Sequence, residues 1–248
     1  MKARLIFTLA LLSLSVFCFA LPKLDIVTEE YPPFNFTQDN QLKGIFVEVM
    51  DYVLKDIGST QTYQDIQVLP WARGYNMALN NENTALFATS FTEERKDLFK
   101  WVGPVLSSNH VLIAKKSKNI KINDVKDIKD YKIGVINKDI AEEIVLNKGV
   151  DRNLLDSIAD PTVNVKKLAM DRVDMIAYGE ITAYWLLKTI DEDAASYETV
   201  NVLQETPLYI AFSKTTSDEI INAFQKSLEK LKTQDKDKFQ EILKKYGN

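Results

Sequence analysis

Short apolar runs alternate with segments of helical periodicity along most of the chain, and this alternation constrains the fold more than any other feature. The pattern predicts strands at residues 24–28, 64–69, 85–88, 111–114, 132–136, 173–178 and 209–212. It predicts helices at residues 44–57, 71–80, 139–148, 163–170, 181–189, 217–231 and 235–246. Strands that alternate with helices indicate an α/β fold, in which mostly parallel strands lie between helical layers.

Residues 1–20 have the pattern of a secretory signal peptide. Lys2 and Arg4 precede an apolar run, and small residues at Cys18 and Ala20 fit a cleavage site. We therefore expect cleavage after Ala20 and export to the periplasm. An uncleaved membrane anchor would need a longer apolar run. A lipid anchor on Cys18 would need a small residue where Phe17 stands.

The composition of the remaining chain disfavours several classes of protein. Cys18 is the only cysteine of the full sequence and lies in the predicted signal peptide, so no disulfide is expected after cleavage. Without Lys2 and Arg4, 29 basic residues face 35 acidic ones, and the net charge of −6 argues against a nucleic-acid partner. His110 is the only histidine, and no carboxylate pattern accompanies it, so we expect no metal site. Glycine-rich phosphate-binding motifs are also lacking, and we expect no cofactor.

The sequence ATSFTEER at residues 88–95 gathers polar groups directly after a predicted strand. Thr92 is placed to cap a helix, with Arg95 at the third helical position. A guanidinium is a two-pronged donor that matches a carboxylate, so Arg95, Ser90 and Thr92 are candidates for binding one. The alternative is a capped surface helix whose Arg95 pairs with a nearby Glu.

This segment resembles the S/T-x-T-x-x-R turn of the bacterial extracellular solute-binding proteins of family 3, and the order of predicted elements is similar over nearly the whole chain. The resemblance implies a type II periplasmic binding protein with two lobes. Lobe 1 would comprise residues 21–109 and 208–248, and lobe 2 residues 110–207. It implies that Arg95 holds the carboxylate of a solute, and that the backbone carbonyl of Ala88 meets an ammonium group.

Further candidates follow from matching this chain to the family. Tyr31 matches an aromatic residue that stacks on the solute, although packing beside the Pro32-Pro33 turn would also explain it. Trp71 and Arg73 open a helix at the expected cleft edge. A buried Trp71 with Arg73 lying over it is the alternative. Tyr178 is expected to contribute from lobe 2.

Two positions depart from the family pattern. Gly179 stands where the family has an Asp that neutralises the ammonium group of an amino acid, and Glu180 follows it as a possible substitute. Asp139 stands where a Gly-Thr pair usually opens a helix that assists in carboxylate binding. A carboxylate at a helix N-terminus opposes a bound anion there. Both departures argue against a standard α-amino acid as the solute.

The resemblance implies a monomeric periplasmic protein that captures a small polar solute, with or without a carboxylate, and delivers it to an inner-membrane ABC permease. It implies binding and lobe closure rather than catalysis. One alternative keeps the fold but reports the solute to a membrane receptor. The other is a secreted dehydratase acting on cyclic carboxylates, for which Glu180 or Glu29 would serve as the general acid.

Overall fold

A computed structural model of the chain describes residues 22–246, and the predicted signal peptide at residues 1–20 lies outside the described residues. The fold is mixed α/β, which confirms the predicted class. An eight-stranded sheet has the order β4-β1-β5-β10-β6-β9-β7-β8, and a separate hairpin pairs β2 with β3. The strands are β1 (Asp25–Thr28), β2 (Phe36–Gln38), β3 (Gln41–Lys43), β4 (Gln67–Val68), β5 (Thr84–Ser90), β6 (Lys100–Lys115), β7 (Ile133–Ile136), β8 (Leu155–Ile158), β9 (Met175–Gly179) and β10 (Tyr197–Phe212).

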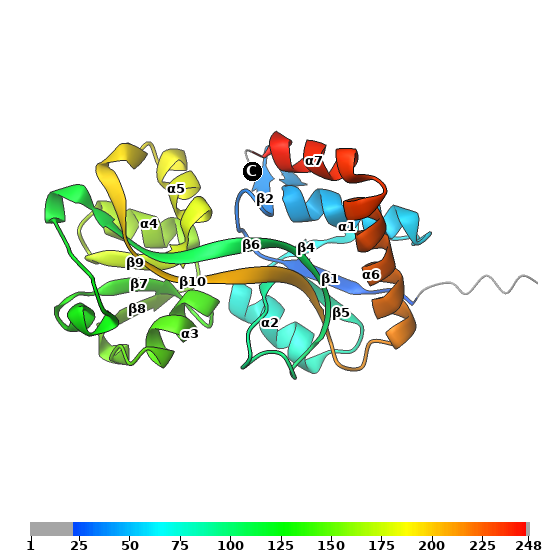
Figure 1. The fold of residues 1–248 in the computed structure, drawn as a ribbon, viewed down its shortest axis with the longest axis horizontal. Helices are drawn as coiled ribbons and strands as arrows, with labels where there is room; N and C mark the ends of the chain where they lie inside the picture. Colours follow the sequence, from blue (N-terminus) through cyan, green and yellow to red (C-terminus); the bar gives the residue numbers. More distant parts are fainter. Residues whose placement is uncertain (1–21, 247–248) are drawn as a thin grey trace, which may run out of the picture.

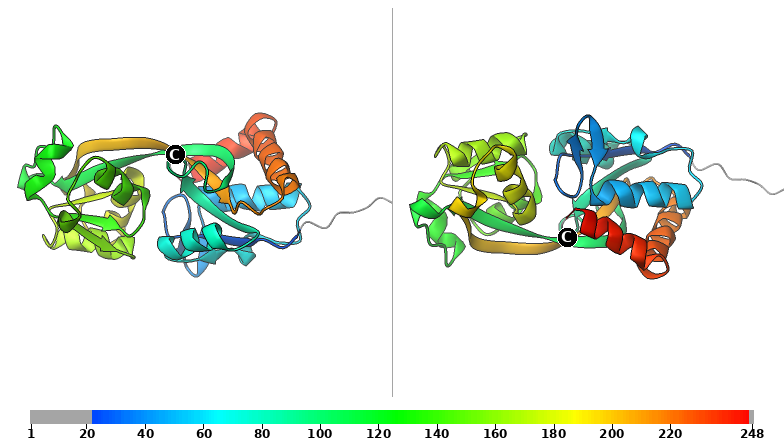
Figure 2. Two further views of the ribbon diagram at one scale, coloured as in Figure 1. Left: turned by 90° about the horizontal axis from the view of Figure 1, so that it is seen from below. Right: turned by 90° about the horizontal axis from the view of Figure 1, so that it is seen from above.

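Helices cover both sides of this sheet, as Figures 1 and 2 show. The α-helices are α1 (Ile45–Asp56), α2 (Trp71–Asn80), α3 (Ile140–Asn147), α4 (Pro161–Ala169), α5 (Glu180–Thr189), α6 (Asp218–Thr233) and α7 (Lys236–Lys245). Short 3₁₀ helices lie at η1 (Tyr63–Asp65), η2 (Lys116–Lys118), η3 (Val125–Asp130), η4 (Arg152–Leu154) and η5 (Ala194–Ser196).

The elements form two groups that only the longest strands connect (Figure 1). One group holds β1 to β5 with α1, α2, α6 and α7, and the other holds β7 to β9 with α3, α4 and α5. The antiparallel pair β6–β10 runs through both. The predicted boundaries at residues 110 and 207 fall within these two strands, and we propose them as the boundaries between lobe 1 and lobe 2.

Alternation along the strands of lobe 2 explains how both faces of its sheet are buried. In β9, Ile176 and Tyr178 join the larger apolar cluster of the molecule. Met175 and Ala177 point the other way, into a second cluster that includes Ile144 of α3. Successive side chains of a strand face opposite sides of the sheet, so one short apolar run serves two cores.

The predicted helix after Thr92 is wrong, because residues 93–98 form turns instead. The backbone N–H of Arg95 still meets Thr92, at 3.3 Å from the hydroxyl and 3.1 Å from the carbonyl oxygen. β6 already begins at Lys100, so the segment has no room for a regular helix. The aromatic pair Phe91–Trp101, with ring centroids 5.0 Å apart, closes the loop.

Candidate functional site

A small closed cavity lies between the lobes. Its volume is about 10 Å³, which is roughly the least that holds one water molecule. Lobe 1 contributes β5, the first residue of α2 and the segments that follow β1 and β5, lobe 2 contributes the start of α3, and β6 contributes His110. The lining residues are Glu29, Tyr31, Trp71, Ala88, Ser90, Arg95, His110, Asp139 and Ile140. A cavity of this volume has no room for anything larger than a water molecule.

A bulge in β5 shapes the wall of the cavity nearest β6 and β10. Ala88 has a positive φ of 58°, and the register with β10 shifts so that Ala88 has no partner across the ladder. A non-glycine residue in this conformation costs about 1–3 kcal/mol and marks a constrained site. Just beyond the bulge, the hydroxyls of Ser90 and Thr206 lie 3.0 Å apart, and Thr206 reaches Nδ1 of His110 at 3.2 Å.

Arg95 is buried, with 1% of its surface exposed. Its Nε donates to Oε2 of Glu143 at 3.0 Å and its Nη2 to Oε1 at 2.7 Å. Because Glu143 belongs to α3, this two-pronged ion pair joins lobe 1 to lobe 2. The guanidinium carbon also lies 5.5 Å from the ring centroid of Trp71 and 5.1 Å from that of Tyr75. Nη1 is left without a hydrogen-bond partner among the described residues.

Trp71 and Tyr31 also cross between the lobes. The indole Nε1 of Trp71 donates to the backbone carbonyl oxygen of Lys138 at 2.7 Å. The ring of Tyr31 packs edge-on against Tyr178, with centroids 5.7 Å apart, and its hydroxyl lies 3.1 Å from that of Ser108. These contacts hold the lobes together around the cavity.

The packing of Tyr31 gives a physical reason for Gly179. A Cβ atom at position 179 would lie 2.3 Å from the hydroxyl oxygen of Tyr31. No side chain fits there while Tyr31 keeps its place. The Asp that the resemblance implied at this position and this orientation of Tyr31 are therefore mutually exclusive.

Two carboxyl groups face the cavity, Glu29 from lobe 1 and Asp139 from lobe 2, and each residue is only 7% exposed. Burial raises the pKa of Glu29 well above its usual range, and repulsion from Asp139 adds to this. Burial also raises the pKa of Asp139 to about 6, although the charge of Arg95 acts in the opposite direction. Burial lowers the pKa of His110 to about 3, so this ring is neutral at physiological pH.

Seven of the nine predicted site residues line the cavity or contact a residue that does. Arg95, Ser90, Tyr31, Trp71 and Ala88 line the cavity, and the structure brings them together. Thr92 supports the backbone of Arg95, and Tyr178 lies behind Tyr31 with its hydroxyl unpartnered among residues 22–246.

Arg73 and Glu180 lie elsewhere. Arg73 is exposed and lines a separate surface hollow with Asn76 and Asn137. Glu180 accepts a hydrogen bond from the hydroxyl of Thr199 at 2.7 Å. We therefore leave both out of the site that we propose below.

Glu143 is the partner of Arg95 in the other lobe, and sequence reasoning missed this role. Position 143 reads as the first turn of an acidic helix, which is usually a solvated face. One alternative considered from the sequence was that Arg95 pairs with a nearby Glu. That alternative expected an exposed pair, whereas the observed ion pair is buried at Arg95 and joins the two lobes. The only local signal is that Asp139 and Glu143 are four residues apart, which places both on one side of α3.

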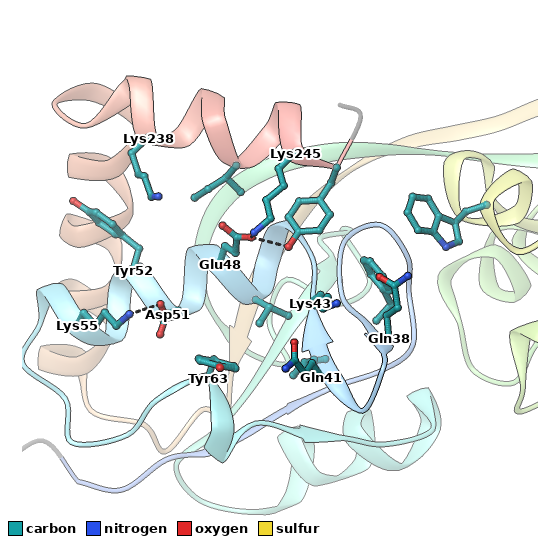
Figure 3. Close-up of a pocket in the computed structure, with 16 residues that line it drawn as sticks. Gln38, Gln41, Lys43, Glu48, Asp51, Tyr52, Lys55, Tyr63, Lys238 and Lys245 are labelled. Carbon is teal, nitrogen blue, oxygen red and sulfur yellow. Dashed lines mark hydrogen bonds and ion pairs between the residues drawn. The ribbon is translucent and has the colours of Figure 1, made fainter. Parts of the chain in front are cut away.

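A much larger hollow lies elsewhere, beside α1, α7 and the β2–β3 hairpin (Figure 3). It has a volume of about 760 Å³. Its cations are largely satisfied by neighbouring acids, since Lys55 pairs with Asp51 and Lys245 with Glu48, each at 2.6 Å. We therefore interpret it as a surface groove with internally paired charges rather than as the solute site.

Neither a metal-binding cluster nor a membrane-spanning helix occurs among residues 22–246. No group of His, Cys, Asp or Glu side chains there is arranged to hold a metal ion. Within the same residues, every helix is too short or too polar to cross a membrane.

Comparison with known proteins yields consistent similarities. A family model described as bacterial extracellular solute-binding proteins, family 3, matches residues 24–248. A protein of Campylobacter jejuni named as a probable histidine-binding protein is 26% identical over 223 residues, which cover 87% of this chain and 81% of that protein.

Two solved structures are similar in fold. A histidine kinase sensor domain with similarity to periplasmic binding proteins has a TM-score of 0.80 at 16% identity, covering 91% of this chain and 96% of that one. The arginine-, lysine-, histidine-binding protein ArtJ from Geobacillus stearothermophilus has a TM-score of 0.73 at 19% identity, covering 91% and 95%.

Proposed function

The chain belongs to the bacterial extracellular solute-binding proteins, family 3, and we propose that it captures a small polar solute between its lobes and delivers it to an ABC permease of the inner membrane. The amino-acid-binding relatives support an amino acid or a related amine as the solute. The predicted signal peptide supports a periplasmic location.

The observation that carries this proposal is the polar cavity between the lobes. It combines a buried guanidinium, two buried carboxyl groups and aromatic walls at the junction of both lobes and the hinge strands. Buried charged groups without full hydrogen bonding are costly, and they cluster where a ligand completes their contacts. Nη1 of Arg95 and Oδ2 of Asp139 are both unpartnered within the described residues.

Capture would proceed by separation and closure of the lobes. The contacts of Arg95 with Glu143 and of Trp71 with Lys138 must break before a solute enters, because the closed cavity has no room for one. The strands β6 and β10 would absorb the hinge motion. Solute held between the lobes would restore closure, and no bond would be made or broken.

A thermal-shift screen of residues 21–248 against amino acids, amines, dicarboxylates and small peptides tests this function. A solute present at about 100 times its Kd stabilises the folded state by about 2.7 kcal/mol. At roughly 2–4 °C per kcal/mol for a chain of this size, Tm should rise by about 5–11 °C.

Arg95→Met removes the ion pair that joins the closed lobes and should reduce the shift, whereas Arg73→Met, a matched change on the exposed side of α2, should preserve it. Mass spectrometry of the recovered solute should find it unchanged. A folded protein that responds to no solute in the screen would overturn the proposal.

A further inference from the structure

The features of the cavity that would bind an anion are largely satisfied by the protein's own carboxylates, and of the guanidinium of Arg95 only Nη1 lacks a partner within residues 22–246. Glu143 occupies two nitrogens of Arg95. At the N-terminus of α3, Oδ1 of Asp139 accepts a hydrogen bond from the N–H of Ile140 at 2.7 Å, and Glu142 accepts one from the N–H of Lys138 at 2.6 Å. A guanidinium and a helix N-terminus are the usual partners of a carboxylate, and here both are engaged from within.

The charge that Glu29 and Asp139 carry when ionised is what lacks compensation. Since Glu143 balances Arg95, the carboxylates of Glu29 and Asp139 have no cation of their own among the residues that line the cavity. Oδ2 of Asp139 is buried and has no hydrogen-bond partner within residues 22–246. An ionised carboxylate in this position gains most from a cation that enters with donors to offer.

The aromatic walls of the cavity also favour binding of an organic cation. Tyr31 and Trp71 line the cavity beside the two acids, and aromatic faces attract organic cations. His110 also lines the cavity, but it is neutral and offers no competing positive charge. Burial raises the pKa of both acids, as expected where counter-charge is missing.

We propose that Glu29 and Asp139 form a cation subsite that takes the ammonium or guanidinium group of a small organic cation, and that this cation needs no carboxylate because Arg95 pairs with Glu143 again when the lobes close. This inference rests on the proposed solute-binding function and narrows its solute class. It differs from the sequence-based expectation, in which Arg95 grips an anionic group.

The test compares cations with anions of equal carbon number. Putrescine and cadaverine are set against succinate and glutarate, together with agmatine, arginine and lysine, in thermal-shift and calorimetric titrations of residues 21–248. At least one of the three carboxylate-free amines should bind, and neither dicarboxylate should.

Two conservative variants locate the subsite. Glu29→Gln and Asp139→Asn keep the size of the side chain and remove its charge, and each should weaken binding of that amine by about tenfold or more. Asn also preserves the cap on α3, because its side-chain oxygen accepts the same hydrogen bond. Glu219→Gln, in the exposed first turn of α6, is the matched control and should leave the affinity unchanged.

The outcomes separate this inference from the function on which it rests. Binding of succinate or glutarate, or binding of lysine and arginine without any of the three amines, would overturn the subsite while leaving solute binding intact. The subsite would also be overturned if only neutral solutes bound. It would be overturned as well if Glu29→Gln and Asp139→Asn both bound the amine as tightly as the parent. A folded protein that binds nothing in the wider screen would remove the proposed function itself.

Discussion

Asp139→Asn should stabilise the solute-free protein at neutral pH, and the structure fixes the size of the gain. The pKa of Asp139 rises from 3.8 to about 6 because its carboxylate is buried. A tenfold change in proton affinity corresponds to about 1.4 kcal/mol, so the ionised form costs the folded state about 3 kcal/mol at pH 7.5. The attraction of Arg95 and the hydrogen bond from Ile140 already contribute to the pKa of about 6. Asparagine resembles the protonated acid and keeps the cap.

The sign of the effect sets the pH window of the assay. An acid whose pKa is higher in the folded state binds more protons when folded, so its presence lowers stability as pH rises from 3.8 to about 6. The Asn variant therefore gains nothing near pH 3.8, and its full gain of about 3 kcal/mol appears above pH 7. Urea unfolding at pH 4 and pH 7.5 measures both values, and the corresponding rise in Tm at pH 7.5 is about 6–12 °C.

Asp237→Asn, an exposed acid in the first turn of α7, is the control and should change stability by less than about 0.5 kcal/mol at either pH. Equal gains for Asp139→Asn at pH 4 and pH 7.5 would refute the electrostatic reasoning, because an uncharged packing effect does not titrate. An absence of any gain at pH 7.5 would refute the claim that the buried charge is uncompensated. Together with the loss of cation binding expected above, a gain would mean that this residue is kept for binding at the expense of stability.

Other substitutions test the contacts between the lobes. Glu143→Gln leaves the buried guanidinium of Arg95 without its counter-charge and should lower the free energy of unfolding by about 2 kcal/mol. The lobes should then separate, and the radius of gyration in small-angle scattering should increase. An unchanged radius and an unchanged stability would contradict this. Gly179→Ala should lower the free energy of unfolding by about 1–3 kcal/mol because its Cβ conflicts with the hydroxyl of Tyr31. Adding Tyr31→Phe should recover part of that loss in urea unfolding. Strictly additive effects of the two substitutions on stability would exclude the conflict. Trp71→Phe removes one hydrogen bond between the lobes and should lower the urea-unfolding free energy by about 1 kcal/mol, and a variant as stable as the parent would show that this bond contributes nothing.

The sequence predicted the regular elements well where a single periodicity persists. The helix predicted at residues 71–80 matches α2, and the strand predicted at 132–136 contains β7. Strands without a clear apolar run were missed, namely the β2–β3 hairpin and β8. The long β6 was predicted only at residues 111–114, because Gly103 and Pro104 interrupt its first half. Pairing with β10 maintains that half as a strand, and such pairing is a property of the fold rather than of the segment.

The candidate site was predictable where residue type and local position suffice. Arg95 and Ser90 follow an apolar strand and were identified from that context. Glu143 was not, because an acid on a helix looks the same whether it faces water or a guanidinium of the other lobe. The exposure of Arg73 could not be predicted either. Trp71 and Arg73 are two residues apart on α2, and the sequence alone does not show which of them faces the core.

The place of β10 in the sheet determines the order in which the molecule can assemble. Residues 208–212 of this strand lie between β5 and β6, although the whole of lobe 2 separates them from β6 in the chain. A chain that emerges from its N-terminus, from a ribosome or through a membrane pore, cannot complete the central ladder of lobe 1 until lobe 2 has emerged as well. Such long-range pairing delays folding. A fragment that ends before residue 197 would leave β5 and β6 each without a central partner, so lobe 1 is expected to remain open until synthesis is nearly finished.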